Sequence, residues 1–249
     1  MYRERLVNTR VTSDSAHRLQ RLLLDYHDFR QHKNAHPLLD NTFRIADWQA
    51  QRLKTTHKDL YEHPGYHTGL EFLLTDLYAP AGMTRRDDNI DRVFPKMVKW
   101  LPDNLLDTFA GLVELNMLTQ RLDLELAEQL ERNQIPAEAF STEHYCEAFR
   151  TSGQRVERER QIALVAEVGQ QLDRYVRNRT LGWLLTMTRT PAEMADLSDL
   201  HDFLHRGYTA FRKMDDVNTL IDRLVVRESR VMANVVAGHP DPFRLPGDL

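Results

Sequence analysis

Apolar residues recur at three- and four-residue spacing along most of the chain, which is typical of amphipathic helices. In the first such segment, at about residues 15–33, Leu19, Leu22, Leu23, Tyr26 and Phe29 would share one helix face. Further segments with this spacing lie at about residues 39–60, 66–78, 84–101, 102–133, 142–150, 154–176, 178–188, 191–214 and 216–236. No segment has the alternating pattern of a strand. The sequence therefore predicts an all-α bundle of roughly nine helices.

The stretch from Tyr66 to Pro102 has the densest apolar helix, followed by a Pro/Gly turn and a second helix. A helix that is apolar over most of its circumference belongs in the middle of a bundle. We therefore expect this stretch to form the central hairpin on which the other helices pack. Pro95 should bend or split its second helix, because proline removes one backbone donor and crowds the preceding turn.

The helical segments follow one another without a linker or an internal repeat, which favours a single domain over residues 1–249. Residues 1–14 are polar, and we expect them to fray. Residues 238–249 should form an irregular tail after Gly238. The chain has only ten glycines and ten prolines, too few for the frequent turns of a many-stranded β protein.

The charge and composition exclude several classes of protein. The formal net charge of -4 gives no overall attraction to nucleic acid, and Glu157 and Glu159 interrupt the one arginine-rich segment. Cys146 is the only cysteine, so no disulfide can form within the chain. The first residues lack the apolar core of a signal peptide, and no apolar run is long enough to span a membrane. We expect a cytoplasmic protein that does not bind nucleic acid.

Several spaced segments resemble an uncharacterised bacterial family named for an FFLEELY motif. Residues 71–78 (EFLLTDLY) stand where that motif would lie, although Leu74 and Thr75 replace its two central acids. Further segments that are similar to the family are Trp48-Gln49, Arg52-Leu53, Asp59-Leu60, Arg85-Arg86-Asp87, Pro95, Leu101-Pro102, Phe203-Leu204, Gly207, Phe211-Arg212, Met214, Arg227-Glu228 and Pro242-Phe243. The resemblance implies a helical bacterial protein of unknown role and supplies no catalytic residues.

A metal site is one possible chemistry for a helical bundle. His201 and His205 are spaced so that both could ligate one ion from a single helix face. Glu71 and Glu114 lie in strongly apolar helices and could project inward, as in bundles that hold two iron or manganese ions. The Glu-x-x-His pair usual in such bundles is missing. A metal-dependent oxidase of the ferritin-like or haem-oxygenase-like type is therefore an alternative hypothesis.

Candidate binding residues gather around the motif segments: Trp48, Arg52, Glu71, Tyr78, Arg85 and Arg86. Glu71 could form an ion pair with Arg52 or Arg85. The two adjacent arginines could bind an anion at a helix start, or pair with nearby aspartates. A further alternative is a small apolar ligand enclosed by aromatic residues, namely Trp48, Tyr66, Tyr78 and Trp183.

The sequence has a large predicted core and no recognisable catalytic motif. The leading hypothesis is therefore a binding, adaptor or regulatory protein that recognises a protein partner or itself. It requires no cofactor. Iron or manganese would be needed only under the oxidase alternative.

Overall fold

The computed structural model describes residues 2–77, 83–136, 138–177, 179–187, 189–190 and 198–245. The predicted all-α bundle is confirmed: these residues form twelve α-helices, one π-helical turn and no strand. Within the described ranges, no helix has both the length and the apolar character needed to cross a bilayer. The elements are α1 (Tyr2–Asn8), α2 (Asp14–Asn34), α3 (Leu39–Thr56), α4 (Lys58–Glu62), α5 (His67–Phe72), η1 (Leu73–Leu77), α6 (Met83–Trp100), α7 (Asp103–Arg132), α8 (Thr142–Thr151), α9 (Arg155–Val176), α10 (Arg179–Met187), α12 (Ser198–Arg212) and α13 (Val217–Val236).

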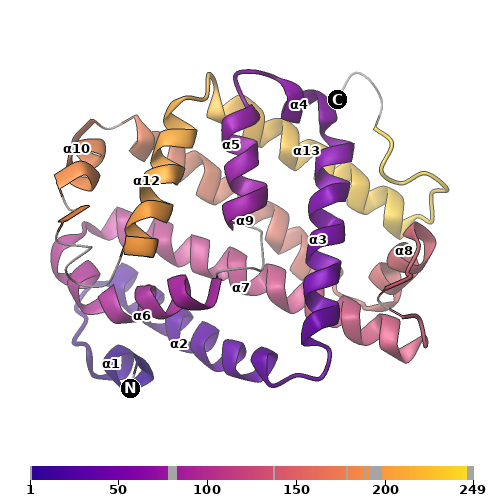
Figure 1. Ribbon diagram of the computed structural model, residues 1–249, viewed down its shortest axis with the longest axis horizontal. Coiled ribbons are helices and arrows are strands. Elements are labelled where there is room, and N and C mark those ends of the chain that lie inside the picture. The colour runs from indigo at the N-terminus through magenta and orange to yellow at the C-terminus, as the bar shows by residue number, and fades with distance from the viewer. Residues whose placement is uncertain are drawn as a thin grey trace.

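Helix α7 is the centre of the bundle. It crosses the middle of the molecule and packs against α2, α3, α8 and α9 (Figure 1). The expectation that residues 66–102 form the central hairpin is wrong, because α5 packs mainly against α12, and α6 packs mainly against α1. At 30 residues α7 is the longest helix, and its buried positions lie on several sides. It can therefore contact more neighbours than the shorter apolar helix α5.

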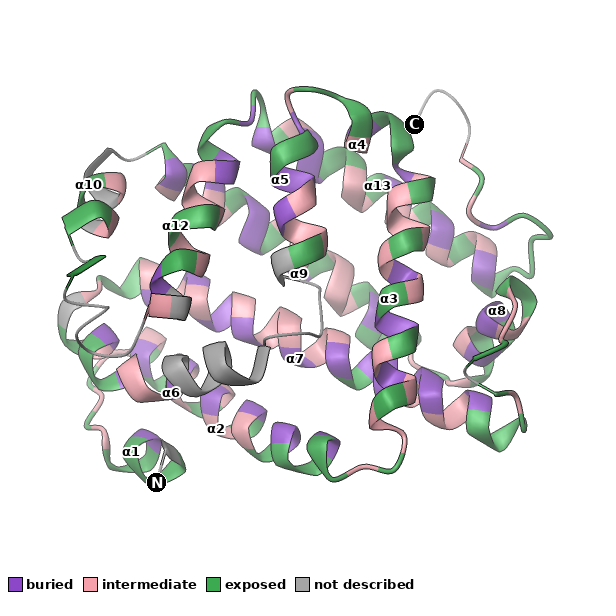
Figure 2. Cartoon of the chain, in the orientation of Figure 1, coloured by how far each residue is buried: buried purple, intermediate pink, exposed green. Residues whose placement is uncertain are grey.

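The buried apolar side chains form three clusters, and Figure 2 shows buried positions recurring along α2, α3, α7 and α13. The first cluster joins α1, α2, α6 and α7. The second joins α4, α5, α9, α12 and α13. The third joins α3, α7, α8 and α13. Helices from all three clusters border the cavity described below.

The predicted helix over residues 39–60 is divided at His57, where α3 ends and α4 begins. His57 has backbone angles φ −109° and ψ 32°, outside the helical region, and its side chain is buried. By contrast, Pro95 does not split α6, which continues from Met83 to Trp100. Residues 73–77 of the motif segment form the π-helical turn η1, and single π-helical turns often occur at functional sites.

The expectation that residues 1–14 fray is wrong for residues 2–8, which form α1. Leu6 is fully buried in the first cluster. The side-chain amide of Gln20 on α2 donates to the carbonyl oxygens of Leu6 and Thr9, at 2.6 and 2.9 Å. One apolar anchor and these two hydrogen bonds fix a segment that looks polar as a whole. At the other end, residues 239–245 are non-helical, as expected for the tail.

The role of Leu6 as an anchor can be tested against its neighbour Val7, which is 52% exposed. We expect Leu6→Ala to lower the free energy of unfolding by about 2–5 kcal/mol, because it leaves a cavity under α1. Val7→Ala should change it by less than about 0.5 kcal/mol. Urea unfolding followed by circular dichroism measures both values. Equal effects of the two substitutions would mean that α1 is not docked.

Candidate functional site

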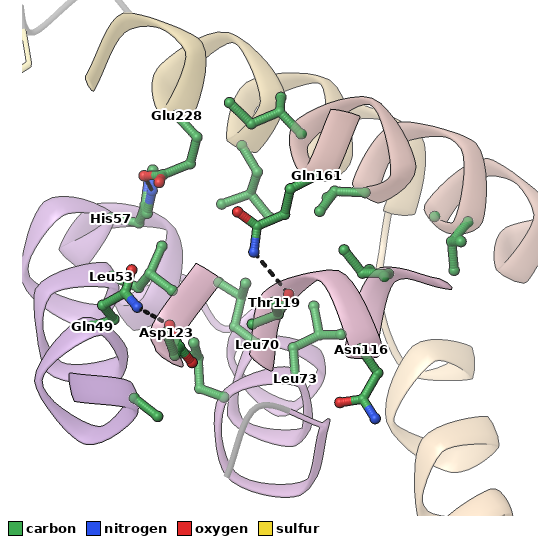
Figure 3. A pocket seen from close by; sticks show the side chains of 18 of the residues that line it. Gln49, Leu53, His57, Leu70, Leu73, Asn116, Thr119, Asp123, Gln161 and Glu228 are labelled. Carbon is green, nitrogen blue, oxygen red and sulfur yellow. Dashed lines mark hydrogen bonds and ion pairs between the residues drawn. The ribbon is translucent and has the colours of Figure 1, made fainter. Parts of the chain in front are cut away.

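A cavity of about 250 Å³ lies inside the bundle, among α3, α5, η1, α7, α9 and α13 (Figure 3). Most of its wall is aliphatic or aromatic. The apolar residues that line it are Phe43, Ala46, Leu53, Leu70, Leu73, Leu74, Leu112, Leu115, Ile162, Val165, Val168, Leu172, Phe211, Ile221, Leu224 and Val225. A mostly apolar concave space with a few polar groups is the usual form of a small-molecule site.

Two glycines set how closely the helices of this wall approach one another. A Cβ atom on Gly111 of α7 would lie 2.9 Å from Cγ2 of Val168 on α9. One on Gly169 of α9 would lie 2.6 Å from Cγ1 of Ile221 on α13. Both distances are too short for real contacts, so only glycine permits these approaches. Helix α9 therefore packs closely against both α7 and α13 and forms one wall of the cavity.

The opposite side is a stripe on α3 and its end, where Gln49, Leu53 and His57 follow one another at four-residue spacing. Residues four apart lie on the same face of a helix. Gln49 and His57 are 6% and 3% exposed, so two polar side chains are buried within this stripe. Figure 3 shows the three side chains in a row along the cavity.

The first polar cluster links α3 to α13 through Glu228. Nη1 of Arg52 donates to both carboxylate oxygens of Glu228, at 2.6 and 2.8 Å. Nε2 of His57 lies 2.7 Å from one of these oxygens. Burial acts to raise the pKa of Glu228, but the charge of Arg52 and the hydrogen bond from His57 outweigh it and hold that pKa at about 2. Glu228 is therefore ionised, and Nε2 of His57 bears the hydrogen that it accepts.

The second polar cluster is built around Asp123 on α7, whose side chain is 4% exposed. Nε2 of Gln49 donates to Oδ1 of Asp123, and the Tyr145 hydroxyl donates to Oε1 of Gln49 at 3.0 Å. Burial raises the pKa of Asp123 to about 7, against the opposing effects of the Arg158 charge, the Gln49 hydrogen bond and the Lys33 charge. Asp123 therefore changes its charge near neutral pH, which is common for groups in functional sites.

A third set of polar groups joins α2 to α7 at the edge of the cavity. Nζ of Lys33 donates to Oε1 of Gln120, and both side chains are buried. The amide groups of Gln120 and Asn116 lie 2.8 and 2.7 Å from the hydroxyl oxygen of Tyr26. The cavity therefore has buried polar groups on one side and an apolar wall on the other.

The structure brings only some of the predicted binding residues to this site. Arg52 lines the cavity, but it pairs with Glu228 and not with Glu71. Glu71 instead accepts a hydrogen bond from the hydroxyl of Tyr61, and lies 3.9 Å from Nζ of Lys54. Tyr61 and Lys54 both line the cavity, so Glu71 contacts two residues of the cavity wall without lining the cavity itself.

The aromatic residues that the sequence predicts around a small apolar ligand lie elsewhere in the structure. Trp48 packs against Tyr145, with ring centroids 4.3 Å apart, in the third cluster. Tyr66 belongs to the second cluster, and Trp183 is 63% exposed. None of these three is among the residues that line the cavity. Tyr78 and the side chains of Arg85 and Arg86 lie outside the described part of the structure.

Three of the four candidate metal ligands have partners of their own, and the fourth, His205, is exposed with its ring 6.3 Å from that of His201. Glu114 pairs with Arg18 and Arg160, each at 2.9 Å. Nε2 of His201 lies 2.6 Å from the carbonyl oxygen of Leu185. Glu71 is occupied by Tyr61, as described above. Among the residues with described positions, no three His, Cys, Asp or Glu side chains lie where they could hold one metal ion.

Sequence reasoning did not identify Asp123, Glu228 or His57 as site residues. A signal existed for Asp123, because it is an acid between Leu122 and Leu124 in an apolar helix. Glu228 belongs to one of the segments similar to the FFLEELY family, but only the fold places it beside Arg52.

The chain belongs to the family described as Domain of unknown function (DUF8198), whose family model matches residues 28–242. No curated protein and no solved structure matches the chain. The prediction of an uncharacterised family is confirmed at this level. Every residue that lines the cavity lies inside the matched range.

The buried carboxyl of Asp123 predicts a pH dependence of stability. Its pKa of about 7 in the folded chain is above the value of about 3.9 for an unfolded aspartate. Between these values the folded protein binds more protons, so the free energy of unfolding should fall as pH rises from about 4 to about 7. The lowered pKa of Glu228 does not contribute in this window, because its stabilisation is lost only as pH falls from about 4.5 towards about 2.

Asp123→Asn should reduce this slope by up to about 1.4 kcal/mol per pH unit, and Asp222→Asn on the exposed face of α13 should leave it unchanged. Urea unfolding of the three proteins over this pH range measures the slopes. The same slope in all three would show that Asp123 does not titrate near neutral pH.

Proposed function

We propose that the protein binds a small, mostly apolar molecule inside the helical bundle and acts through binding rather than catalysis. The observation that supports this function is the cavity of about 250 Å³ with its apolar wall and buried polar stripe. It is larger than the cavity of about 150 Å³ that holds benzene in a protein core. It is slightly smaller than the range of about 300–1,000 Å³ typical of drug-sized ligands.

The apolar character of the wall supports the same proposal. Most of the residues that line the cavity are aliphatic or aromatic. A hydrocarbon that covers them would remove apolar surface from water, which is worth roughly 25 cal/mol per Å². Water in this space could hydrogen-bond to the polar stripe but not to the apolar wall.

A second candidate function is the recognition of a protein partner or of another copy of the chain. Trp183 and Met187 lie one turn apart on α10 and are 63% and 60% exposed. Large apolar side chains that share an exposed helix face favour an interaction surface. We also propose that the protein is bacterial and cytoplasmic. These two expectations rest on the sequence alone.

Two adjacent valines on α13 provide a matched test of the ligand site. Val225 lines the cavity, whereas Val226 is 52% exposed. We expect Val225→Trp to weaken binding of the neutral fluorescent probe N-phenylnaphthylamine by at least about tenfold, which is about 1.4 kcal/mol, because the indole takes up the ligand's space. Val226→Trp should bind the probe as the wild type does.

Circular dichroism establishes that both variants are folded, and Ile162→Trp on α9 provides a second way to fill the cavity if Val225→Trp is not. Equal affinities in wild type and a folded cavity-filling variant, or no probe binding by the wild type, would contradict the proposed function.

The second candidate has its own test. If α10 is an interaction surface for another copy, the wild type should self-associate with increasing concentration in sedimentation velocity experiments. Trp183→Ala should weaken this association by about tenfold, as is common when a central interface tryptophan is removed. A wild type that stays monomeric at every concentration would contradict self-association at this surface.

A further inference from the structure

A smaller polar pocket of about 50 Å³ adjoins the apolar cavity. The two share Gln49, Arg52, Gln161, Ile162 and Glu228 as lining residues. The polar pocket is also lined by Tyr145 on α8 and by Arg158 on α9. The shared residues form a common wall, so the apolar chamber has one end that is rich in polar groups.

Positive charge predominates at this polar end. Arg158 is 5% exposed, and its guanidinium carbon lies 3.8 Å from the centre of the Phe149 ring. Arg52 is held by the two oxygens of Glu228. Arg52, Arg158 and Glu228 line the small pocket, and the larger cavity adds the buried Lys33 and Asp123, so the two adjoining spaces together have three cations and two carboxyl groups. The count becomes three cations to one anion when Asp123 is protonated.

We propose that the ligand is an amphipathic carboxylate, with its apolar body in the cavity and its carboxylate at the polar end beside Arg158, and that Asp123 takes up a proton from solvent when it binds. This inference rests on the proposed function and specifies the chemical class of the ligand. Guanidinium groups are well suited to carboxylates because they donate in a planar fork.

The proton uptake follows from the groups that surround Asp123. It faces Arg158 from α9, Lys33 from α2 and the Gln49 amide from α3, with Tyr145 from α8 behind Gln49. The ion pair of Arg52 with Glu228 lies in the same polar wall. A second carboxylate in this space would compete with Asp123 for the same positive charges, and like charges favour protonation of one partner. Binding should therefore weaken as pH rises and the proton on Asp123 becomes harder to supply.

Three ligands with the same hydrocarbon chain separate the contribution of the head group. Octanoic acid, octanol and octylamine would each be used to displace N-phenylnaphthylamine from the full-length protein. We expect octanoic acid to bind about tenfold more tightly than octanol near neutral pH, and octylamine to bind most weakly. Above neutral pH, the affinity for octanoic acid should fall by up to about tenfold per pH unit, while that for octanol stays constant.

Two substitutions test the residues. Asp123→Asn should remove the pH dependence of octanoic acid binding, and circular dichroism would show that this variant is folded. Arg158→Gln should reduce the preference for the acid over the alcohol, and Arg158→Lys, which keeps the charge, should restore part of it. A change in overall fold would alter octanol binding as well, so the alcohol reports whether each variant is intact.

The outcomes distinguish this inference from the function on which it rests. If neither the probe nor octanol binds, the proposed function fails. If both bind but octanoic acid binds no more tightly than octanol, or binds with no pH dependence in the wild type, the carboxylate proposal fails and the apolar site remains.

Discussion

The ion pair between Arg52 and Glu228, whose side chains are 11% and 22% exposed, joins α3 to α13 across the cavity. Helix α3 packs mainly on α7, whereas α13 packs mainly on α9 and α8. The pair, together with the hydrogen bond between His57 and Glu228, closes the space between α3 and α13 at the polar end of the cavity. Because both side chains are largely shielded from water, this pair should contribute more than an exposed ion pair, which is worth about 0–1 kcal/mol. Together with the packing of α3 on α7 and the hydrogen bond from Gln49 to Asp123, this contact holds α3 and the polar stripe of the cavity in place.

The sequence predicts the helices better than their arrangement. Hydrophobic spacing locates α2, α7, α8, α9 and α13 to within a residue or two, because it reports directly which positions are buried. Hydrophobic spacing does not show which neighbouring helix buries each position. For this reason the sequence predicts residues 66–102 as the centre of the bundle, whereas α7 occupies the centre in the structure. The division at His57 also has no local signal. The His57 side chain there is hydrogen-bonded to Glu228, a residue far away in the sequence.

The same limit applies to the site. Arg52 could be selected from the sequence, but its predicted partner Glu71 is bonded to Tyr61 instead. The sequence predicts Trp48 as a binding residue, yet it packs among Tyr145, Phe140 and Phe243 and does not line the cavity. Whether an aromatic residue in a helix lines a cavity or fills a core depends on how neighbouring helices diverge, and periodicity contains no information about that. The polar residues of the cavity come from separate helices, and only the fold brings them together.

If the space between α3, α7, α9 and α13 holds an apolar ligand, octanol should occupy it in a crystal structure of the protein grown with this alcohol. Octanol is the suitable probe because it does not depend on the charge of the polar end. We expect continuous electron density for the hydrocarbon chain between Leu53 on α3 and Val165 on α9, with Val225 in contact. Density for ordered water throughout this space, or side chains that have closed it while octanol is absent, would mean that it is not a ligand site.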